Sequence, residues 1–272
     1  MLQDFFLNFS NSLNATSVVY IWLFQILFCY FSILGALRFF GKMGIYVYVA
    51  IAIILANIQV LKVIEFPFFP EPMALGTILF ISIFLCTDIL NEYFDKESAT
   101  KCIYLGISAY LFSTIIMFLT ISLNPIDPSL NESWAWSYDM HNAIQTIFLP
   151  QFPIIVASIF AFFISQKIDI FIFSYLKNKE NSKLWFRNNI STIFSQFVDN
   201  LIFSLLAFNL LSSNPVPAIV LIISYGIGIY LIRIALNSLL RMPVLEFELR
   251  VEPRPTFSIT LFGIVGTPMD KE

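Results

Sequence analysis

Apolar residues are gathered into blocks of about twenty along this chain, and short polar or proline-bearing segments separate them. A helix needs about 20 residues to cross the ~30 Å hydrocarbon core of a membrane, because it rises about 1.5 Å per residue. Seven blocks are long enough, at residues 18–38, 44–63, 73–92, 101–123, 150–176, 189–212 and 215–241. The pattern predicts an all-α fold, a polytopic transmembrane bundle of about seven helices.

The composition supports a membrane protein and excludes an ordinary soluble domain. Of the 272 residues, 58% are hydrophobic and 12% are charged, whereas soluble domains have roughly 45–50% and about 25%. The mean hydropathy is +0.81. The net charge of −3 carries little information, because the placement of charge matters more than its sum in a membrane protein.

Basic residues alternate between the two sides of the predicted bundle. Twelve of the fifteen follow the first, third, fifth and seventh blocks: Arg38, Lys42, Lys96, Lys101, Lys177, Lys179, Lys183, Arg187, Arg241, Arg250, Arg254 and Lys271. Because basic segments resist translocation, this side is expected to be cytoplasmic. We expect a multi-pass protein of the cell inner (plasma) membrane, with its N-terminus outside and its C-terminus in the cytoplasm.

Ionisable and amide residues occur inside the predicted helices, where each is costly and therefore a candidate functional residue. Asp88 and Glu92 are four residues apart and share one helix face. The fifth and sixth blocks add two further pairs, each with a spacing of three: Gln166 with Asp169, and Gln196 with Asp199. Glu92 lies near a helix end, where it could instead contact headgroups and water.

The two later pairs belong to a repeated phrase, SQxxDxxIFSxL, in which seven of twelve positions are identical. The two helices run in opposite directions. Asp169 is expected about 10 Å and Asp199 about 15 Å from the cytoplasmic side, which is nearly one level. Such a pair is typical of a carrier site built by pseudo-symmetric elements near the midplane. A chance repeat among apolar residues is the alternative.

Other polar residues have two interpretations each. Arg233 in the seventh block could neutralise one of the carboxylates. Arg187 is either a charge partner of the site or an interfacial anchor. The single histidine, His141, cannot form a multi-histidine metal site, so we predict no metal. No nucleotide-binding loop occurs, so ATP hydrolysis by this chain is not expected, and no cofactor is predicted.

Several motifs, in order and spacing, resemble the queuosine precursor transporters of the vitamin-uptake-like group. They are LANIQVLK, DILNEY, SxxAxxxSQxxD, LWxRNxxST and SQxxDxxxF, and the resemblance covers residues 46–242. It implies a six-helix transporter core at 44–242. Residues 1–43 would then form an external segment with an added helix, and 243–272 a cytoplasmic tail. Asp95 stands where the family usually has Gly, and Pro153 where it often has Arg.

The resemblance also implies a function: import of a 7-deazaguanine such as preQ0, preQ1 or queuine for tRNA modification, as a secondary carrier. The implied substrate-binding residues are Asn57, Asp88, Glu92, Gln166, Asp169, Gln196 and Asp199, with support from Arg187, Asn188, Ser191, Thr192 and Arg233. A carboxylate can accept the adjacent N–H groups of a guanine-like edge, and an amide can serve the carbonyl and ring nitrogens. Asp88 with Glu92 is expected to act in gating or proton coupling.

Two alternatives differ from a self-sufficient carrier. The chain could be a substrate-capturing subunit for a vitamin-like micronutrient, with a separate energising partner. It could also be an intramembrane enzyme that uses Asp169 and Asp199 as an aspartyl pair, although the usual flanking signatures of such enzymes are absent. The expected partners are a small molecule and the lipid bilayer, with no nucleic acid, and a homo-oligomer remains open.

Overall fold

A computed structural model describes residues 2–14, 16–65, 73–127, 129, 132–149, 152–179 and 184–211. The helices are α1 (Leu2–Asn14), α2 (Val18–Gln59), α3 (Thr77–Tyr93), α4 (Lys96–Ile121), α5 (Ala135–Phe148), α6 (Phe152–Lys179) and α7 (Leu184–Leu205). A 3-10 turn at Glu132–Trp134 precedes α5, and a π-helical turn at Leu206–Leu210 follows α7. Two short strands, β1 (Val63–Ile64) and β2 (Met73–Ala74), pair in antiparallel fashion between α2 and α3.

Helix α2 doubles back on itself at Gly41. This glycine has φ 58° and ψ −142°, a conformation outside the helical range that L side chains rarely adopt. Gln25 Nε2 donates to Gln59 Oε1 at 3.2 Å, whereas a straight helix would separate residues 34 positions apart by about 51 Å. The blocks at 18–38 and 44–63 are therefore two antiparallel helical segments.

The other described blocks each correspond to one helix: α3, α4, α6 and α7. The seventh block, at 215–241, lies outside the described residues, as does the tail at 243–272. Two helices were not predicted, α1 and α5. They have 13 and 14 residues and contain polar residues throughout, so neither shows the long apolar run from which the blocks were identified.

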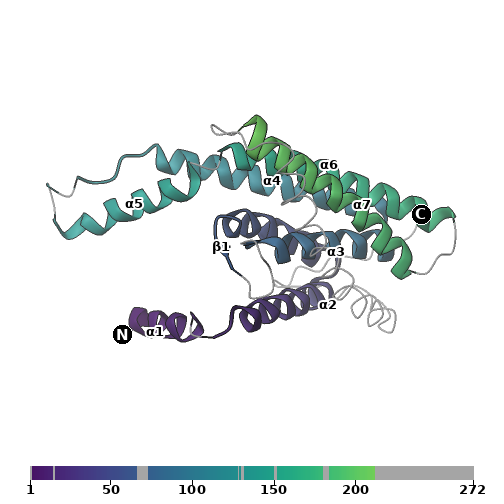
Figure 1. Cartoon of the computed structure of the whole chain (residues 1–272), viewed down its shortest axis with the longest axis horizontal. Helices are drawn as coiled ribbons and strands as arrows, with labels where there is room; N and C mark the ends of the chain where they lie inside the picture. The colour runs from purple at the N-terminus through teal and green to yellow at the C-terminus, as the bar shows by residue number, and fades with distance from the viewer. Residues whose placement is uncertain are drawn as a thin grey trace, which may run out of the picture.

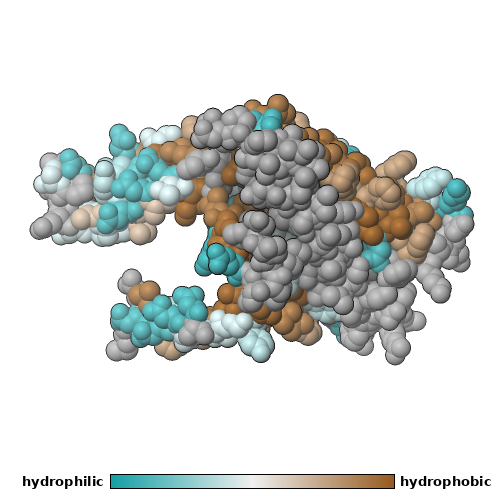
Figure 2. Space-filling view, in the orientation of Figure 1, coloured by the Kyte–Doolittle hydropathy of each residue, from teal (hydrophilic) through white to brown (hydrophobic). Residues whose placement is uncertain are grey.

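The chain is a multi-pass helical membrane protein, as the sequence predicted. Three described helices are long and apolar enough to cross a membrane: Val18–Gln59, Lys96–Ile121 and Ile154–Lys179. Helix α3, with 17 residues, is at the lower limit of a span. Large rings such as Phe112, Phe171 and Phe194 point outward. Figure 2 shows hydrophobic colours over much of the described bundle and hydrophilic colours over α1 and α5.

Helix α3 is the centre of the bundle. Almost every residue from Thr77 to Asn91 is buried, and α3 contacts α2, α4 and α6. Helices α6 and α7 form an antiparallel hairpin with the most extensive contact between any two described elements (Figure 1). The segments α1, β1–β2 and α5 lie toward one end of the bundle, here called the α5 end. The α3–α4 turn, the last turn of α6 and the first turn of α7 lie at the other, the α7 end.

The turn from α3 to α4 at the α7 end is closed by Asp95, the N-cap of α4. Its Oδ1 accepts from the Ser98 N–H at 2.5 Å, and its Oδ2 accepts from the Ser98 hydroxyl at 2.9 Å. These bonds hold the pKa of Asp95 below its ordinary value. Both Asp and Gly are favoured at N-caps. The side chain of Asp95 therefore supplies a suitable start for α4.

Candidate functional site

A ladder of polar contacts joins α3 to α6. The Thr87 hydroxyl lies 3.1 Å from Gln166 Oε1, and one turn further on Asn91 Nδ2 donates to Ser174 Oγ at 3.1 Å. Asp88, which lies between Thr87 and Asn91 in the sequence, is fully buried. Because hydrocarbon offers no hydrogen-bond partners, polar side chains inside a bundle are drawn to neighbouring helices. The ladder fixes the register of α3 against α6.

The two SQxxD segments on α6 and α7 hold each other reciprocally. Ser165 Oγ donates to Asp199 Oδ1 at 3.1 Å, and Ser195 Oγ donates to Asp169 Oδ1 at 2.9 Å. Each serine also lies near a carbonyl one turn back, at 3.1 and 3.2 Å. A hydroxyl has only one hydrogen, and a carboxylate is the stronger acceptor. The serine of each repeat therefore orients the aspartate of the other.

This exchange gives the α6–α7 hairpin a local pseudo-two-fold axis. Asp169 is level with Ser195, and Asp199 is four residues further along α7, so the two carboxylates differ in level by about 6 Å. Asp169 is fully buried, and Asp199 is partly buried. The repeated phrase in the sequence thus corresponds to two equivalent half-sites on antiparallel helices.

The glutamines of the two repeats are buried with unused hydrogen-bonding capacity. The Gln166 amide contacts Thr87 through its Oε1. Its Nε2 has no partner among the described residues. Gln196 Oε1 also has none within that part of the chain. Nearly all buried polar atoms in proteins are satisfied, so such atoms call for an explanation. A polar ligand beside the carboxylates would provide one.

Glu92 binds two cations at the α7 end. Its Oε1 accepts from Arg187 Nη2 at 2.5 Å, and its Oε2 lies 3.5 Å from Lys177 Nζ. Lys177 also donates to the carbonyls of Asn91 and Glu92, at 2.8 and 2.9 Å, which caps the end of α3. The Arg187 guanidinium lies 5.6 Å from the centre of the Phe173 ring. The cluster ties α3, α6 and α7 together.

The other supporting residues predicted on α7 line its inner face. Asn188, Ser191 and Thr192 are buried. Ser191 and Thr192 lie three and four residues after Asn188 and four and three before Ser195, so they continue the polar stripe along α7 toward Asp199. The Ser191 hydroxyl donates to the carbonyl of Asn188 at 3.2 Å. Arg233 lies outside the described residues.

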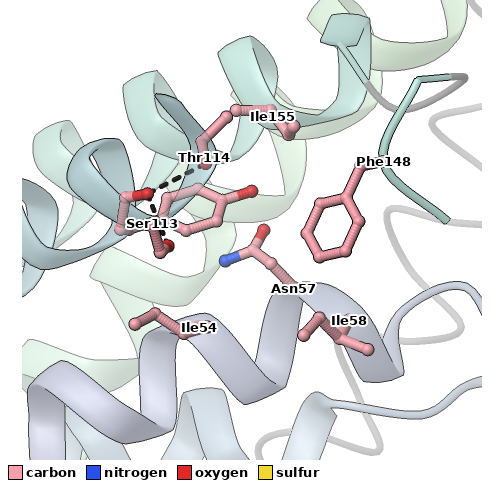
Figure 3. Close-up of a pocket in the computed structure, with 8 residues that line it drawn as sticks. Ile54, Asn57, Ile58, Ser113, Thr114, Phe148 and Ile155 are labelled. Carbon is pink, nitrogen blue, oxygen red and sulfur yellow. Dashed lines mark hydrogen bonds between the residues drawn. The ribbon is translucent and has the colours of Figure 1, made fainter. Parts of the chain in front are cut away.

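Asn57 lies in a different place from the carboxylates. It lines a small cavity between α2, α4, α5 and α6, together with Ile54, Ile58, Tyr110, Ser113, Thr114, Phe148 and Ile155 (Figure 3). None of the other predicted substrate-binding residues lines this cavity. The structure thus brings the predicted residues of α3, α6 and α7 onto facing helices and sets Asn57 apart.

Sequence reasoning missed the partners that orient the predicted residues. Ser165 and Ser195 were not among the predicted site residues, because serines in transmembrane helices commonly serve close helix packing. Their position inside both copies of SQxxD was the available signal. Ser174 also stands at an identical position of the repeated phrase. Thr87 carries no such signal, because a hydroxyl in an apolar helix usually bonds to its own backbone.

The geometry so far describes a membrane bundle with buried carboxylates and amides on facing helices. A family described as "Putative vitamin uptake transporter" matches residues 74–247. A Bacillus subtilis (strain 168) protein named "Probable queuosine precursor transporter" is 32% identical over 191 residues, which cover 69% of this chain and 78% of that relative. No solved structure matches significantly. The resemblance found in the motifs is confirmed, and the chain belongs to the vitamin uptake transporter family.

Proposed function

We propose that this chain imports a 7-deazaguanine precursor of queuosine, such as preQ0, preQ1 or queuine, and that it does so as a secondary carrier. One observation carries the proposal: in a chain of this family, two carboxylates on neighbouring helices are held by reciprocal serine bonds between α6 and α7. The relative from Bacillus subtilis is named for a queuosine precursor. Import of this class of base would make the chain a supplier of substrate for tRNA modification.

The carboxylates suit the N–H edge of such a base. A carboxylate has about four lone-pair sites, so the bond from a serine leaves acceptor capacity for an adjacent N–H and amino group. A fixed carboxylate is also already oriented, which reduces the entropy lost when the ligand binds. We assign the edge contact to Asp169 or Asp199, and the carbonyl and ring-nitrogen contacts to Gln166 and Gln196. Arg187, Asn188, Ser191 and Thr192 would support the site.

The Glu92 cluster would act as a gate at the α7 end. Asp88 lies one turn before Glu92 on the same helix, so a change in protonation or ligation at Asp88 could reach the ion pair with Arg187 along α3. Opening the site toward the α7 end requires α3 and α7 to separate, which breaks that pair. The pair therefore favours the closed arrangement.

The α7 end would face the cytoplasm of a cell with the chain in its inner (plasma) membrane. Several described basic residues lie toward this end: Lys42, Lys96, Lys177, Lys179 and Arg187. Basic residues favour the cytoplasmic side of a membrane. A reporter that functions only in the cytoplasm should be active when it is fused after residue 271. Activity restricted to the outside of the cell would contradict this orientation.

An uptake assay tests the function. It measures the accumulation of labelled preQ0, preQ1 and queuine in a strain that neither makes nor imports these bases. Cells expressing the chain should accumulate at least one of them, whereas Asp169→Asn and Asp199→Asn should not. Asp139→Asn is the matched control, because Asp139 is exposed on α5 and its charge is removed in the same way. Normal uptake by both site variants would refute the site, and no uptake of any base by the wild type would refute the function.

The same assay separates a self-sufficient carrier from a capturing subunit. Uptake should persist in a host that lacks any energising module for vitamin uptake. Binding of the base without uptake in that host would show that an additional subunit is required. Modification of the base on passage, detected by mass spectrometry, would indicate an enzyme instead.

A further inference from the structure

The cavity around Asn57 is a second polar site, separate from the carboxylates. It measures ≈ 10 Å³, about the room that one water molecule needs. Four helices contribute to its wall, and Asn57 from α2 projects into it beside Phe148 from α5 (Figure 3). Asn57 is near the end of α2, and Ile155 near the start of α6. The cavity therefore lies in the half of the bundle toward the α5 end.

The cavity presents hydrogen-bond acceptors from Asn57, Ser113 and Thr114, together with the Tyr110 hydroxyl, which can donate or accept. Asn57 is 3% exposed, and one of the two N–H groups of its Nδ2 donates to the carbonyl of Ile53 at 2.8 Å. Its Oδ1 is buried and has no donor within the described part of the chain. The hydroxyls of Ser113 and Thr114 both donate to the carbonyl of Tyr110, at 2.8 and 2.9 Å. Their hydrogens are used, so their oxygens can only accept from a ligand.

The lining also selects by charge and shape. None of the described residues that line the cavity is ionisable at neutral pH, because a tyrosine is neutral there. A charged ligand would lose its hydration without a counter-charge, which is costly. The rings of Phe148 and Tyr110 provide apolar faces on which a flat ring can stack. The cavity suits a neutral, flat molecule with N–H donors.

The cavity is too small for such a molecule unless a wall moves, and α5 is the wall that can move. Pockets for small molecules usually have about 300–1,000 Å³. No residue of α5 is buried, and α5 stands out from the bundle, with its main contacts to α4 and to the 3-10 turn before it (Figure 1). Segments with few buried contacts open at low free-energy cost. Phe148, the last residue of α5, would move with the helix.

The geometry points to an outer binding site, in which Asn57 Oδ1 accepts an N–H of the neutral base and Phe148 covers its ring before the base reaches the carboxylates. This inference rests on the proposed function and adds a step to it. The site in the structure is the closed form. Asn57 is a specificity residue for capture, and it takes no part in the later transfer to α6 and α7.

The test compares capture with transfer in the full chain, by the KM and maximal rate of labelled preQ0 uptake. Asn57→Leu removes the acceptor and keeps a similar volume. It should raise KM about tenfold, the loss expected for one hydrogen bond, with a maximal rate within twofold of wild type. Phe148→Ala should also raise KM. Asn57→Gln keeps a carbonyl oxygen and should recover part of the affinity.

The matched controls are Asn142→Leu, an exposed amide on α5, and Phe112→Ala, a ring on the outward face of α4. Neither should change KM. Melting in detergent provides a second readout: Asn57→Leu should be at least as stable as wild type, because a buried acceptor without a donor is removed.

The outcomes are separable. An unchanged KM for Asn57→Leu, with lower stability, would mean that the cavity holds only a structural water, and the inference would be overturned. A collapse of the maximal rate at normal KM would also overturn it, by placing Asn57 in transfer. Absence of uptake by the wild type would refute the proposed function, and the outer site with it.

Discussion

The ion pair between Glu92 and Arg187 should be among the most strongly coupled pairs in the bundle. The side chains are 16% and 8% exposed, and their closest atoms are 2.5 Å apart. The perturbation is a double-mutant cycle of Glu92→Gln, Arg187→Gln and the double variant. Each substitution removes a charge and keeps a polar side chain. Glu92→Gln also keeps the shape of the side chain, whereas Arg187→Gln shortens it and removes the contact with the Phe173 ring, and the double variant corrects for that loss.

The structure sets the expected magnitudes. Removing one partner of a buried ion pair costs about 3–5 kcal/mol, because the other charge stays buried. Loss of Arg187 leaves Glu92 with Lys177 at 3.5 Å, so we expect only about 1–3 kcal/mol for Arg187→Gln. Glu92→Gln removes the anion from two cations, and we expect about 3–4 kcal/mol. The coupling free energy should be about 2 kcal/mol.

The assay is denaturant unfolding of the purified chain in detergent, at low salt and at 1 M salt. A buried pair is screened little, so the coupling should persist at high salt. The control is Glu97→Gln, whose partner Lys101 is four residues away on an exposed helix face. That pair should contribute about 0.3–0.5 kcal/mol at most. Additive effects of the two site substitutions, within about 0.5 kcal/mol, would refute a coupled buried pair.

Further predictions concern the serines and the α4 cap. Ser165→Ala and Ser195→Ala should each cost about 0.6–1.7 kcal/mol of stability and lower preQ0 uptake severalfold, measured by melting and by labelled uptake. Unchanged uptake in both would show that the serines do not orient the site. Asp95→Ala should destabilise α4 by about 1 kcal/mol, and Asp95→Gly by a few tenths, in the same melting assay. Hydrogen bonds from Ser98 lower the pKa of Asp95 in the folded chain. The contribution of Asp95 to stability is therefore fully present above its pKa in the unfolded chain, about 3.9, and is lost as the pH falls below that value. The difference between wild type and Asp95→Ala should therefore shrink in acid, and a constant difference would contradict the cap.

The sequence predicted the long helices well, because apolar length is a local property. The block at 101–123 became Lys96–Ile121, and the block at 150–176 became Phe152–Lys179. The separation of 18–38 from 44–63 was also correct, since Gly41 stands at the reversal between them. Short helices such as α5 were missed, because helix formation there does not depend on a membrane-spanning apolar run.

The candidate site was less accessible from sequence, because its contacts join residues far apart in the chain. Counts of basic residues were enough to predict the orientation of the chain in the membrane. They did not decide whether Arg187 is an interfacial anchor or a partner of the site. Its contact with Glu92, 95 positions earlier, depends on how α3 and α7 pack together. Asn57 shows the converse difficulty: the resemblance grouped it with the carboxylates, yet its neighbours in space belong to another cavity.

Site geometry and helix packing depend on the same bonds in α6 and α7, which decides how the site should be tested. Lipid tails are as apolar as the side chains that face them, so polar contacts and close packing hold membrane helices together. Replacing Ser195 therefore disturbs both packing and the orientation of Asp169. Asp169→Asn is different, because its amide oxygen can still accept from Ser195 while the negative charge is lost. A variant that melts like the wild type and no longer takes up the base would place the function on the charge itself, and a large loss of stability would instead make Asp169 a packing residue.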